Sequence, residues 1–356
     1  MAPAEPSPAP RRRGFLASGG WILLLAVGLV AAVMLTHVVT ALRHRGRAVG
    51  DGRDPRTYGY ALAPSRVARE AIVAAGMPKD GLPALIEPVA WSLAELDAAA
   101  ARQRRSKLLV ADDAVIGVCL GGQARAYPLR FLVWHEVVDD TLASEPILVA
   151  YHPLSGGAVV ARRPVDTVLA VSGLLLDSTH LLYGRNPRGL GESLWSPLML
   201  RAVTGPAAAA GAVLEPLPND VTTWRAWRDR HPETTVLAPV GTLREEYGRD
   251  PYASYLGNDE LRFPVRRELP AAWFPRKTEV LAVRLDGRWV ALSFPAMVAL
   301  ADANGLASVE AGGRTWRVQV GLKPPTLVLE DGSQPVVRAF AFAWYALHPH
   351  DTLWVR

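Results

Sequence analysis

The sequence predicts an α+β fold: a mostly antiparallel β body with short helices, preceded by one N-terminal transmembrane helix. Three observations support this prediction. From residue 112 onwards, short β-rich runs alternate with turn residues. Half of the 356 residues are hydrophobic and 21% are charged, which is enough apolar material for a buried core. Residues 21–42 contain no Asp, Glu, Lys or Arg.

The N-terminal segment has the composition of a membrane anchor. Residues 1–20 are rich in Pro and Ala and end in an Arg-rich flank, and we expect a disordered cytoplasmic tail. A helix over residues 21–42 would span about 30 Å, the thickness of bilayer hydrocarbon. Arg12-Arg13-Gly14-Phe15-Leu16 matches the centre of a twin-arginine export signal, and no convincing cleavage site follows the apolar run. We therefore expect a signal anchor that crosses the lipid bilayer once, with the globular domain outside the cytoplasm.

The charge distribution argues against a nucleic-acid partner. The chain carries a net charge of +5, and residues 1–53 hold seven arginines against two acidic residues. The remainder is therefore neutral, with 32 basic and 32 acidic residues, and has no basic surface for DNA or RNA. Cys119 is the only cysteine, which excludes an intramolecular disulfide and a Cys-rich metal site.

Residues 43–64 are expected to form a polar linker and residues 65–356 the globular domain. Ser92 and Glu95 have the spacing of a capping box, which marks the start of a helix. Helices are expected over residues 65–75, 92–105, 129–138 and 222–230.

The β-rich runs are bounded by glycine and polar turn residues. Gly121-Gly122 lies between two of them, as in a two-residue hairpin turn. Strands are expected over residues 114–120, 123–127, 147–151, 158–162, 168–171, 181–183, 315–320, 326–329 and 336–342.

A weak internal repeat relates two of these hairpins. Residues 115–126 (VIGVCLGGQARA) align with residues 280–291 (VLAVRLDGRWVA) at a constant offset of 165. The alignment is compatible with two related α+β units, over residues 112–240 and 276–354. Hairpins of this composition are common, so a chance similarity is the alternative.

Three clusters contain candidate functional residues, while the usual nucleotide-binding, hydrolase and zinc-protease motifs are absent. Each cluster has a purely structural alternative: a histidine at a helix end, a tight turn between strands, and a core tryptophan with a surface arginine. A histidine beside a carboxylate can act as a base or bind a metal, and an arginine can hold an anion. The candidate residues are His135 and Glu136 in the first cluster, Tyr151, His152 and Ser155 in the second, and Tyr183, Arg185 and Trp195 in the third.

Several strings resemble one family, the bacterial and archaeal domain of unknown function 3179. The resemblance runs from about residue 112 to 354 and implies an exported or membrane-anchored protein, but no defined activity. The strings are VIG (115–117), AYPL (126–129), HEVVDD (135–140), VSGLL (171–175), SLWS (193–196), WRAWRDRHP (224–232), YGRDPYASY (247–255) and FAWYALHP (342–349).

The chain departs from the family pattern at two places. Relatives typically carry a Tyr-Cys-Pro-Leu-Cys-Gly loop, which implies a metal or thiol site. Here His152 and Ser155 replace the two cysteines, so the protein is a divergent member without dithiol chemistry. The Tyr-Asp-Arg string of relatives reads Tyr183-Gly184-Arg185, without the carboxylate.

Three functional hypotheses follow. The first is a ligand-binding or scaffold module that is degenerate in the Cys loop, with a small molecule or a protein as its partner. The second is a metal-binding protein or metal-dependent enzyme in which His135 and His152 hold a transition metal. The third is a metal-free enzyme with His135 as base and Arg185 holding an anionic substrate.

Overall fold

The computed structural model describes residues 25–31, 33–35, 49–102, 108–185, 191–241, 245–322 and 325–356. The chain divides into two units, Met1–Ala48 and Val49–Arg356. In the first unit, the described residues 25–31 and 33–35 are helical and exposed. Of the predicted transmembrane segment, residues 21–24, 32 and 36–42 lie outside the described residues, as do the 1–20 tail and residues 43–48. Within the described ranges, no helix has the length and apolar character that a membrane crossing requires.

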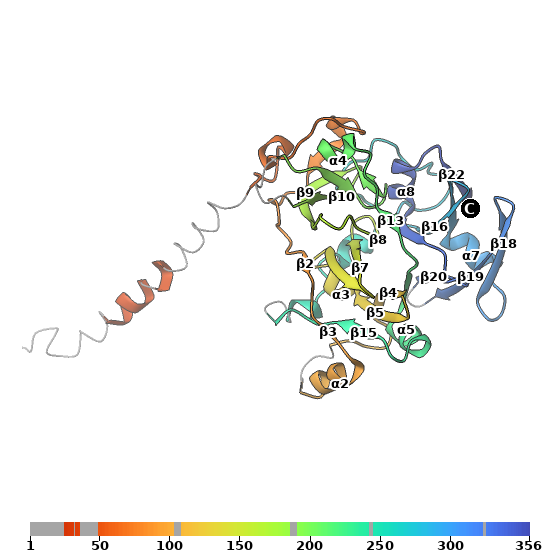
Figure 1. Cartoon of the computed structure of the whole chain (residues 1–356), viewed down its shortest axis with the longest axis horizontal. Coiled ribbons are helices and arrows are strands. Elements are labelled where there is room, and N and C mark those ends of the chain that lie inside the picture. Colours follow the sequence, from red (N-terminus) through yellow and green to blue (C-terminus); the bar gives the residue numbers. More distant parts are fainter. Residues whose placement is uncertain are drawn as a thin grey trace, which may run out of the picture. The chain divides into compact units, whose positions relative to one another are not determined.

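The second unit is built around a nine-stranded sheet (Figure 1). Its pairs are antiparallel except β2 with β6 and β17 with β22, and β13 (Glu215–Pro216) pairs with the end of β8. In spatial order the other strands are β2 (Leu85–Ile86), β6 (Val137–Leu142), β7 (Glu145–His152), β8 (Gly157–Arg162), β21 (Val336–Phe340), β16 (Glu279–Leu285), β17 (Arg288–Ser293) and β22 (Thr352–Val355).

A five-stranded sheet covers one face of this central sheet. Its strands, in order, are β1 (Ile72–Ala74), β9 (Leu169–Leu176), β10 (Thr179–Gly184), β11 (Leu194–Ser196) and β12 (Arg201–Ala202). Alternate residues of β7, Leu148 and Ala150, belong to the same buried cluster as Val171 and Leu182 of this covering sheet. His152 continues that alternation, which places it on the side of β9 and β10.

A second five-stranded sheet covers the opposite face. Its strands are β14 (Asp220–Thr223), β4 (Ala114–Leu120), β5 (Gln123–Pro128), β15 (Thr235–Leu237) and β3 (Ala90–Trp91). Ile147 and Val149, the other set of β7 residues, pack with Ile116 and Tyr127 of this sheet. Strand β7 is therefore buried on both faces, which explains its nearly continuous apolar sequence. The α+β, mostly antiparallel fold class is confirmed.

The C-terminal half adds a three-stranded sheet of β18 (Leu306–Ala311), β19 (Arg314–Leu322) and β20 (Pro325–Leu329). It packs on the hairpin of β16 and β17. This hairpin and that of β4 and β5 have identical strand lengths at the 165-residue offset, and a helix follows each. The hairpins lie in different sheets, and the descent of two units from a duplication stays a prediction.

The helices are short because most begin directly after a strand. They are α2 (Leu93–Arg102), α3 (Leu129–Leu132), α4 (Gly205–Ala209), α5 (Trp224–Arg230), α6 (Ala253–Leu256), α7 (Phe294–Leu300) and α8 (Ala341–Leu347). The predicted capping box is confirmed, since Glu95 accepts the Ser92 N–H at 2.7 Å and Ser92 Oγ accepts the Glu95 N–H at 3.3 Å. The prediction for residues 129–138 was wrong beyond Leu132, because the next residues turn into β6.

The predicted helix over residues 65–75 was also wrong. Residues Arg69–Ala71 form a single 3-10 turn, and Ile72–Ala74 is β1, which pairs with the edge of β9. An eleven-residue helix is marginal in water, whereas pairing satisfies the exposed backbone of the β9 edge. Residues 49–64, assigned to a linker from the sequence, are part of the compact unit, and Tyr58 and Tyr60 are buried.

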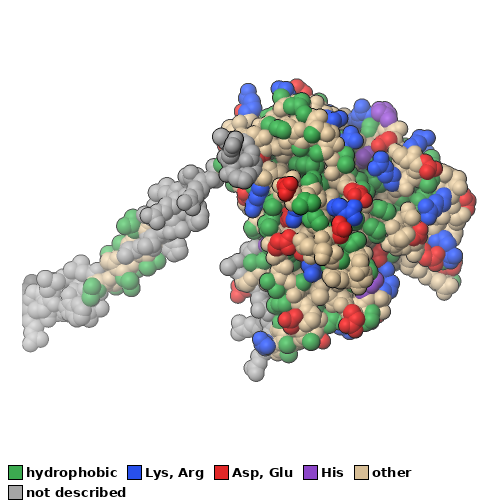
Figure 2. All heavy atoms as spheres, viewed as in Figure 1, with side chains coloured by type: hydrophobic (Ala, Val, Ile, Leu, Met, Phe, Trp, Pro, Cys, Tyr) green, Lys and Arg blue, Asp and Glu red, His purple; other side chains and the backbone are tan. Residues whose placement is uncertain are grey.

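Acidic and basic side chains are interspersed over the face of the body that Figure 2 shows. This mixture agrees with the balanced charge of the sequence after residue 53.

Candidate functional site

A small cavity of about 60 Å³ lies between the end of β7 and the strands β9 and β10. Besides Tyr252 and Arg262, its lining contains three ionisable side chains, those of Glu136, His152 and His180. Each is at most 4% exposed. Buried polar groups of this kind are costly unless they are bonded to one another, so their contacts define what the site can do.

His152 is held by a tight turn. Strand β7 ends at His152 and β8 begins at Gly157, and the Ser155 N–H donates to the His152 carbonyl at 3.1 Å. Gly156 has φ +59° and lies so close to Phe340 that a Cβ would approach its ring to 2.8 Å, so only glycine fits. The Nδ1 atom of His152 lies 2.8 Å from Ser155 Oγ. The two positions where relatives carry cysteines are therefore in direct contact.

Glu136 adopts a strained backbone conformation with φ +58°. A residue other than glycine in this left-handed region costs about 1–3 kcal/mol, and such strain often accompanies functional positions. Its backbone is fixed on both sides, by the carbonyl of Leu132 at 2.7 Å and the N–H of Tyr151 at 2.8 Å. The conformation aims the carboxylate at Nδ1 of His180, 3.2 Å away.

His180 on β10 completes the site, and the sequence reasoning missed it. Its ring stacks on that of His152, with the centroids 4.8 Å apart and the planes at 27°. One signal was available: β10 reads Thr-His-Leu-Leu-Tyr-Gly, and a histidine in so apolar a strand needs a partner. We name Glu136, His152 and His180 the buried triad.

The protonation of the buried triad follows from its contacts. The Glu136 carboxylate accepts a hydrogen bond from Nδ1 of His180, and in the neutral form of this ring Nε2 is an acceptor. Burial, with a smaller contribution from His180, lowers the pKa of His152 well below its usual range, so this ring is neutral. Neither Nε2 atom has a hydrogen-bond partner among the described residues.

The rest of the cavity wall is mainly apolar. Tyr252, directly before α6, and Arg262 and Phe263, between α6 and β16, also line the cavity. Burial and the nearby Glu136 carboxylate raise the pKa of Tyr252 to about 12, so its hydroxyl stays protonated. The apolar wall residues include Met77, Leu154, Val171, Leu174, Leu175 and Leu181. A cavity with one polar end and apolar walls is typical of a small-molecule site.

His135 lies outside the cavity. Its Nδ1 is 2.7 Å from the Pro83 carbonyl and its Nε2 is 2.6 Å from the Tyr247 hydroxyl. Both ring nitrogens are therefore engaged, and burial lowers the pKa of His135. Continued alternation from β6 would place His135 beside Val137, but the left-handed backbone of Glu136 interrupts it. The structure brings Glu136, His152 and Ser155 together, and it adds His180 where the sequence favoured His135.

The remaining candidates lie elsewhere. Tyr151 points to the opposite face of β7 and lines a surface pocket beside Tyr252. Asp80 joins Tyr183 and Arg185, at 2.7 and 3.2 Å, and so supplies the carboxylate that the Tyr-Gly-Arg string lacks. Trp195 is 2% exposed and belongs to the core.

The donor set offers limited support for a metal. Among the described residues, no three His, Cys, Asp or Glu side chains are arranged to hold a metal ion. Within the buried triad, the two Nε2 atoms and Oε1 of Glu136 carry no hydrogen bond to another described residue, because only Oε2 of the carboxylate is bonded to His180. Protein zinc sites use at least three protein ligands.

No curated protein and no solved structure matches this chain. One family model matches residues 79–321 and bears the description "Protein of unknown function (DUF3179)". The matched region contains the buried triad and every resembling string except that at residues 342–349. The absence of the Cys-x-x-Cys loop agrees with the single cysteine of the chain. The chain therefore belongs to the DUF3179 family, as a member without the family's paired cysteines.

Proposed function

We propose that this protein is a membrane-anchored, extracytoplasmic binding module that holds a small ligand at the buried triad. The uncharged run of residues 21–42 and the preceding Arg12-Arg13 pair support the anchor and the direction of export. The single observation that carries the binding function is the pair of stacked imidazoles lining a cavity whose other wall residues are mainly apolar.

The chemistry of the buried triad defines a ligand class. The carboxylate of Glu136 accepts hydrogen bonds, and so does the Nε2 atom of His180 when its ring is neutral. At the buried triad the ligand therefore needs a head group that donates, such as a primary amine or an alcohol, whereas Arg262 on the same cavity wall would hold an anion. A volume of about 60 Å³ limits the ligand to a few heavy atoms, with a short apolar body against the leucine-rich wall.

A metal site is the second candidate. One observation favours it: a carboxylate bonded to Nδ1 of a histidine, as Glu136 is to His180, commonly orients metal-binding imidazoles. If the protein binds a metal, His152 and His180 would be its protein ligands, and water would complete the coordination. The pairing of His135 with His152 has less support, because both ring nitrogens of His135 are engaged.

Thermal unfolding of the full chain in a non-ionic detergent tests the proposal. Tryptophan fluorescence follows unfolding in the presence of propylamine, 1-propanol, propionate or Zn²⁺. A ligand at one hundred times its Kd stabilises the native state by about 2.7 kcal/mol, which raises Tm by roughly 5 °C. We expect propylamine or propanol to raise Tm, and Glu136→Gln and His180→Gln to abolish the rise. His350→Gln, which replaces an exposed histidine, is the matched control and keeps it.

Three results would count against the binding proposal. Stabilisation by propionate alone would contradict the donor–acceptor argument, and stabilisation that survives Glu136→Gln and His180→Gln would place the ligand elsewhere. Stabilisation by Zn²⁺ alone, lost in both His152→Gln and His180→Gln, would favour the metal site. The anchor has its own test, since the untrimmed chain should remain with the membrane fraction until detergent is added.

A further inference from the structure

We propose that the cavity between Arg201 and Arg284 is a second ligand site, which binds a small organic anion with an aromatic body. It lies away from the buried triad and shares no lining residue with that cavity. This proposal therefore does not depend on the proposed function of the buried triad.

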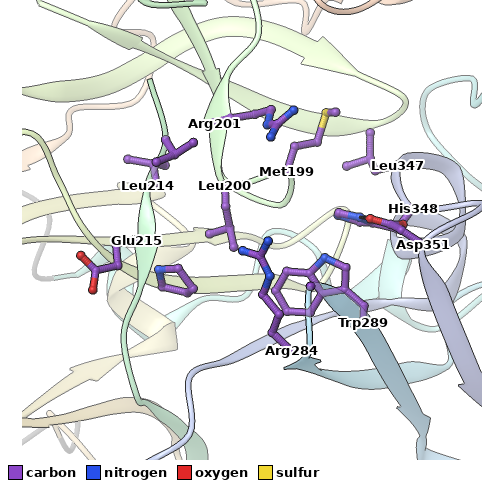
Figure 3. Close-up of a pocket in the computed structure, with 13 residues that line it drawn as sticks. Met199, Leu200, Arg201, Leu214, Glu215, Arg284, Trp289, Leu347, His348 and Asp351 are labelled. Atoms are coloured by element: carbon purple, nitrogen blue, oxygen red, sulfur yellow. Dashed lines mark hydrogen bonds and ion pairs between the residues drawn. The ribbon is translucent and has the colours of Figure 1, made fainter. Parts of the chain in front are cut away.

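The cavity is large enough for such a ligand. Its volume is about 450 Å³, within the range of small-molecule sites. Figure 3 shows Arg201 and Met199 on one side and Arg284 and Trp289 on the other. Arg201 belongs to β12 of a covering sheet, whereas Arg284 and Trp289 belong to the hairpin of β16 and β17. Two separate sheets thus supply the opposing walls.

The charges around the cavity leave its two arginines available. Neither the Arg201 nor the Arg284 side chain forms an ion pair or hydrogen bond in the described part of the chain, although the charge of Arg284 helps to lower the pKa of Asp351. The two lining carboxylates are already engaged. Glu215 pairs with Arg162 and points away from both arginines in Figure 3, and Asp351 lies 3.2 Å from Nδ1 of His348.

The two arginines favour an anion as the ligand of this cavity. A carboxylate or phosphate in the cavity would be attracted by both guanidinium groups, which line it from opposite walls (Figure 3). Arginine suits this role because its planar fork donates two parallel hydrogen bonds to such groups. Lysine and histidine provide no such fork.

The walls favour an aromatic body on the anion. The Arg284 guanidinium lies 5.8 Å from the centre of the Trp289 ring, so a cation and an indole meet at one edge of the cavity. Trp344 packs edge-on against Trp289, with the ring centres 5.0 Å apart and an angle of 85°, and this contact fixes the indole. Apart from Glu215, His348 and Asp351, the remaining wall is mainly apolar and includes Met199, Leu200, Leu214 and Leu347.

Isothermal titration of the full chain in non-ionic detergent tests the proposal. The probes are benzoate and phenyl phosphate, with benzamide as the neutral analogue of benzoate and inorganic phosphate as the head group alone. We expect benzoate or phenyl phosphate to bind, and benzamide and inorganic phosphate to bind at least tenfold more weakly. Each of Arg201→Gln and Arg284→Gln should weaken binding of the organic anion about tenfold, the effect of losing one charge-assisted hydrogen bond.

Arg288→Gln is the matched control, since Arg288 is exposed on the same hairpin and does not line the cavity. It should leave the affinity unchanged, and so should His180→Gln at the buried triad. Failure of both organic anions to bind would overturn the proposal. Equal binding of benzamide, or an equal loss in Arg288→Gln, would also overturn it. Loss of benzoate binding in His180→Gln would assign the anion to the buried triad instead.

Discussion

The stability of the protein should depend on pH through His152, and the structure sets the size of the effect. Burial lowers the pKa of His152 well below the usual 6.5. Below pH 6.5 the unfolded chain therefore binds a proton at this position that the native state excludes, and stability falls as pH falls. Each such histidine contributes up to about 1.4 kcal/mol per pH unit between 6.5 and its folded pKa.

His152→Gln removes this contribution while keeping a polar group beside Ser155. His135, whose pKa burial also lowers, remains in both proteins, so the difference between them isolates residue 152. Between pH 6.5 and 5.5 the wild-type protein should lose about 1 kcal/mol more stability than the variant. The comparison uses the change with pH, so a constant loss of stability in the variant does not affect it.

Urea unfolding of the full chain in non-ionic detergent, at pH 7.5, 6.5 and 5.5, measures the effect. His350→Gln, at an exposed position, serves as control and should keep the wild-type dependence. If His152→Gln and the wild type lose the same free energy between pH 6.5 and 5.5, the ring at position 152 is not held neutral. The account of the buried triad would then be wrong.

Three further predictions concern backbone and packing. Glu136→Gly should be about 1 kcal/mol more stable than Glu136→Ala, because only glycine tolerates φ +58° freely, and equal urea midpoints would argue against the strain. Gly117→Ala should lower the free energy of unfolding by about 1–3 kcal/mol, because a Cβ there would lie 2.2 Å from the Trp227 ring. Gly241→Ala is the control: its Cβ would meet no neighbour, so the urea midpoint should hardly change. Ser92→Ala should cost about 1 kcal/mol by removing the helix cap, and an unchanged thermal midpoint would show that the cap contributes nothing.

The proposed second ligand site lies between two sheets of the protein. Arg201 and Trp289 come from strands of different sheets, so an anion bound between them would couple those sheets. Such a ligand stabilises only the state in which both sheets are packed. The buried triad likewise lies between β7 of the central sheet and β10 of a covering sheet. Both sites thus use the interface between layers.

Local sequence patterns were enough to predict several elements of the fold. The capping box at Ser92 and the hairpin at Gly121-Gly122 depend on residues within four positions of each other, and both were predicted correctly. The prediction over residues 65–75 failed because its outcome depended on a distant partner, the edge of β9. Short segments without a strong local preference take the structure that their tertiary neighbours favour.

In the candidate site, too, some residues could be predicted from the sequence and others only from the tertiary structure. From the sequence alone, Glu136, His152 and Ser155 were candidates, because one lies beside a histidine and the other two lie in a polar loop after a predicted strand. Only the tertiary structure decided that His180, and not His135, faces His152. His135 is next to Glu136 in the chain, but the left-handed backbone of Glu136 interrupts the strand alternation, and Glu136 rather than His135 contacts His180. His180 lies 28 residues beyond His152, and the packing of one sheet on another brings the two rings into contact.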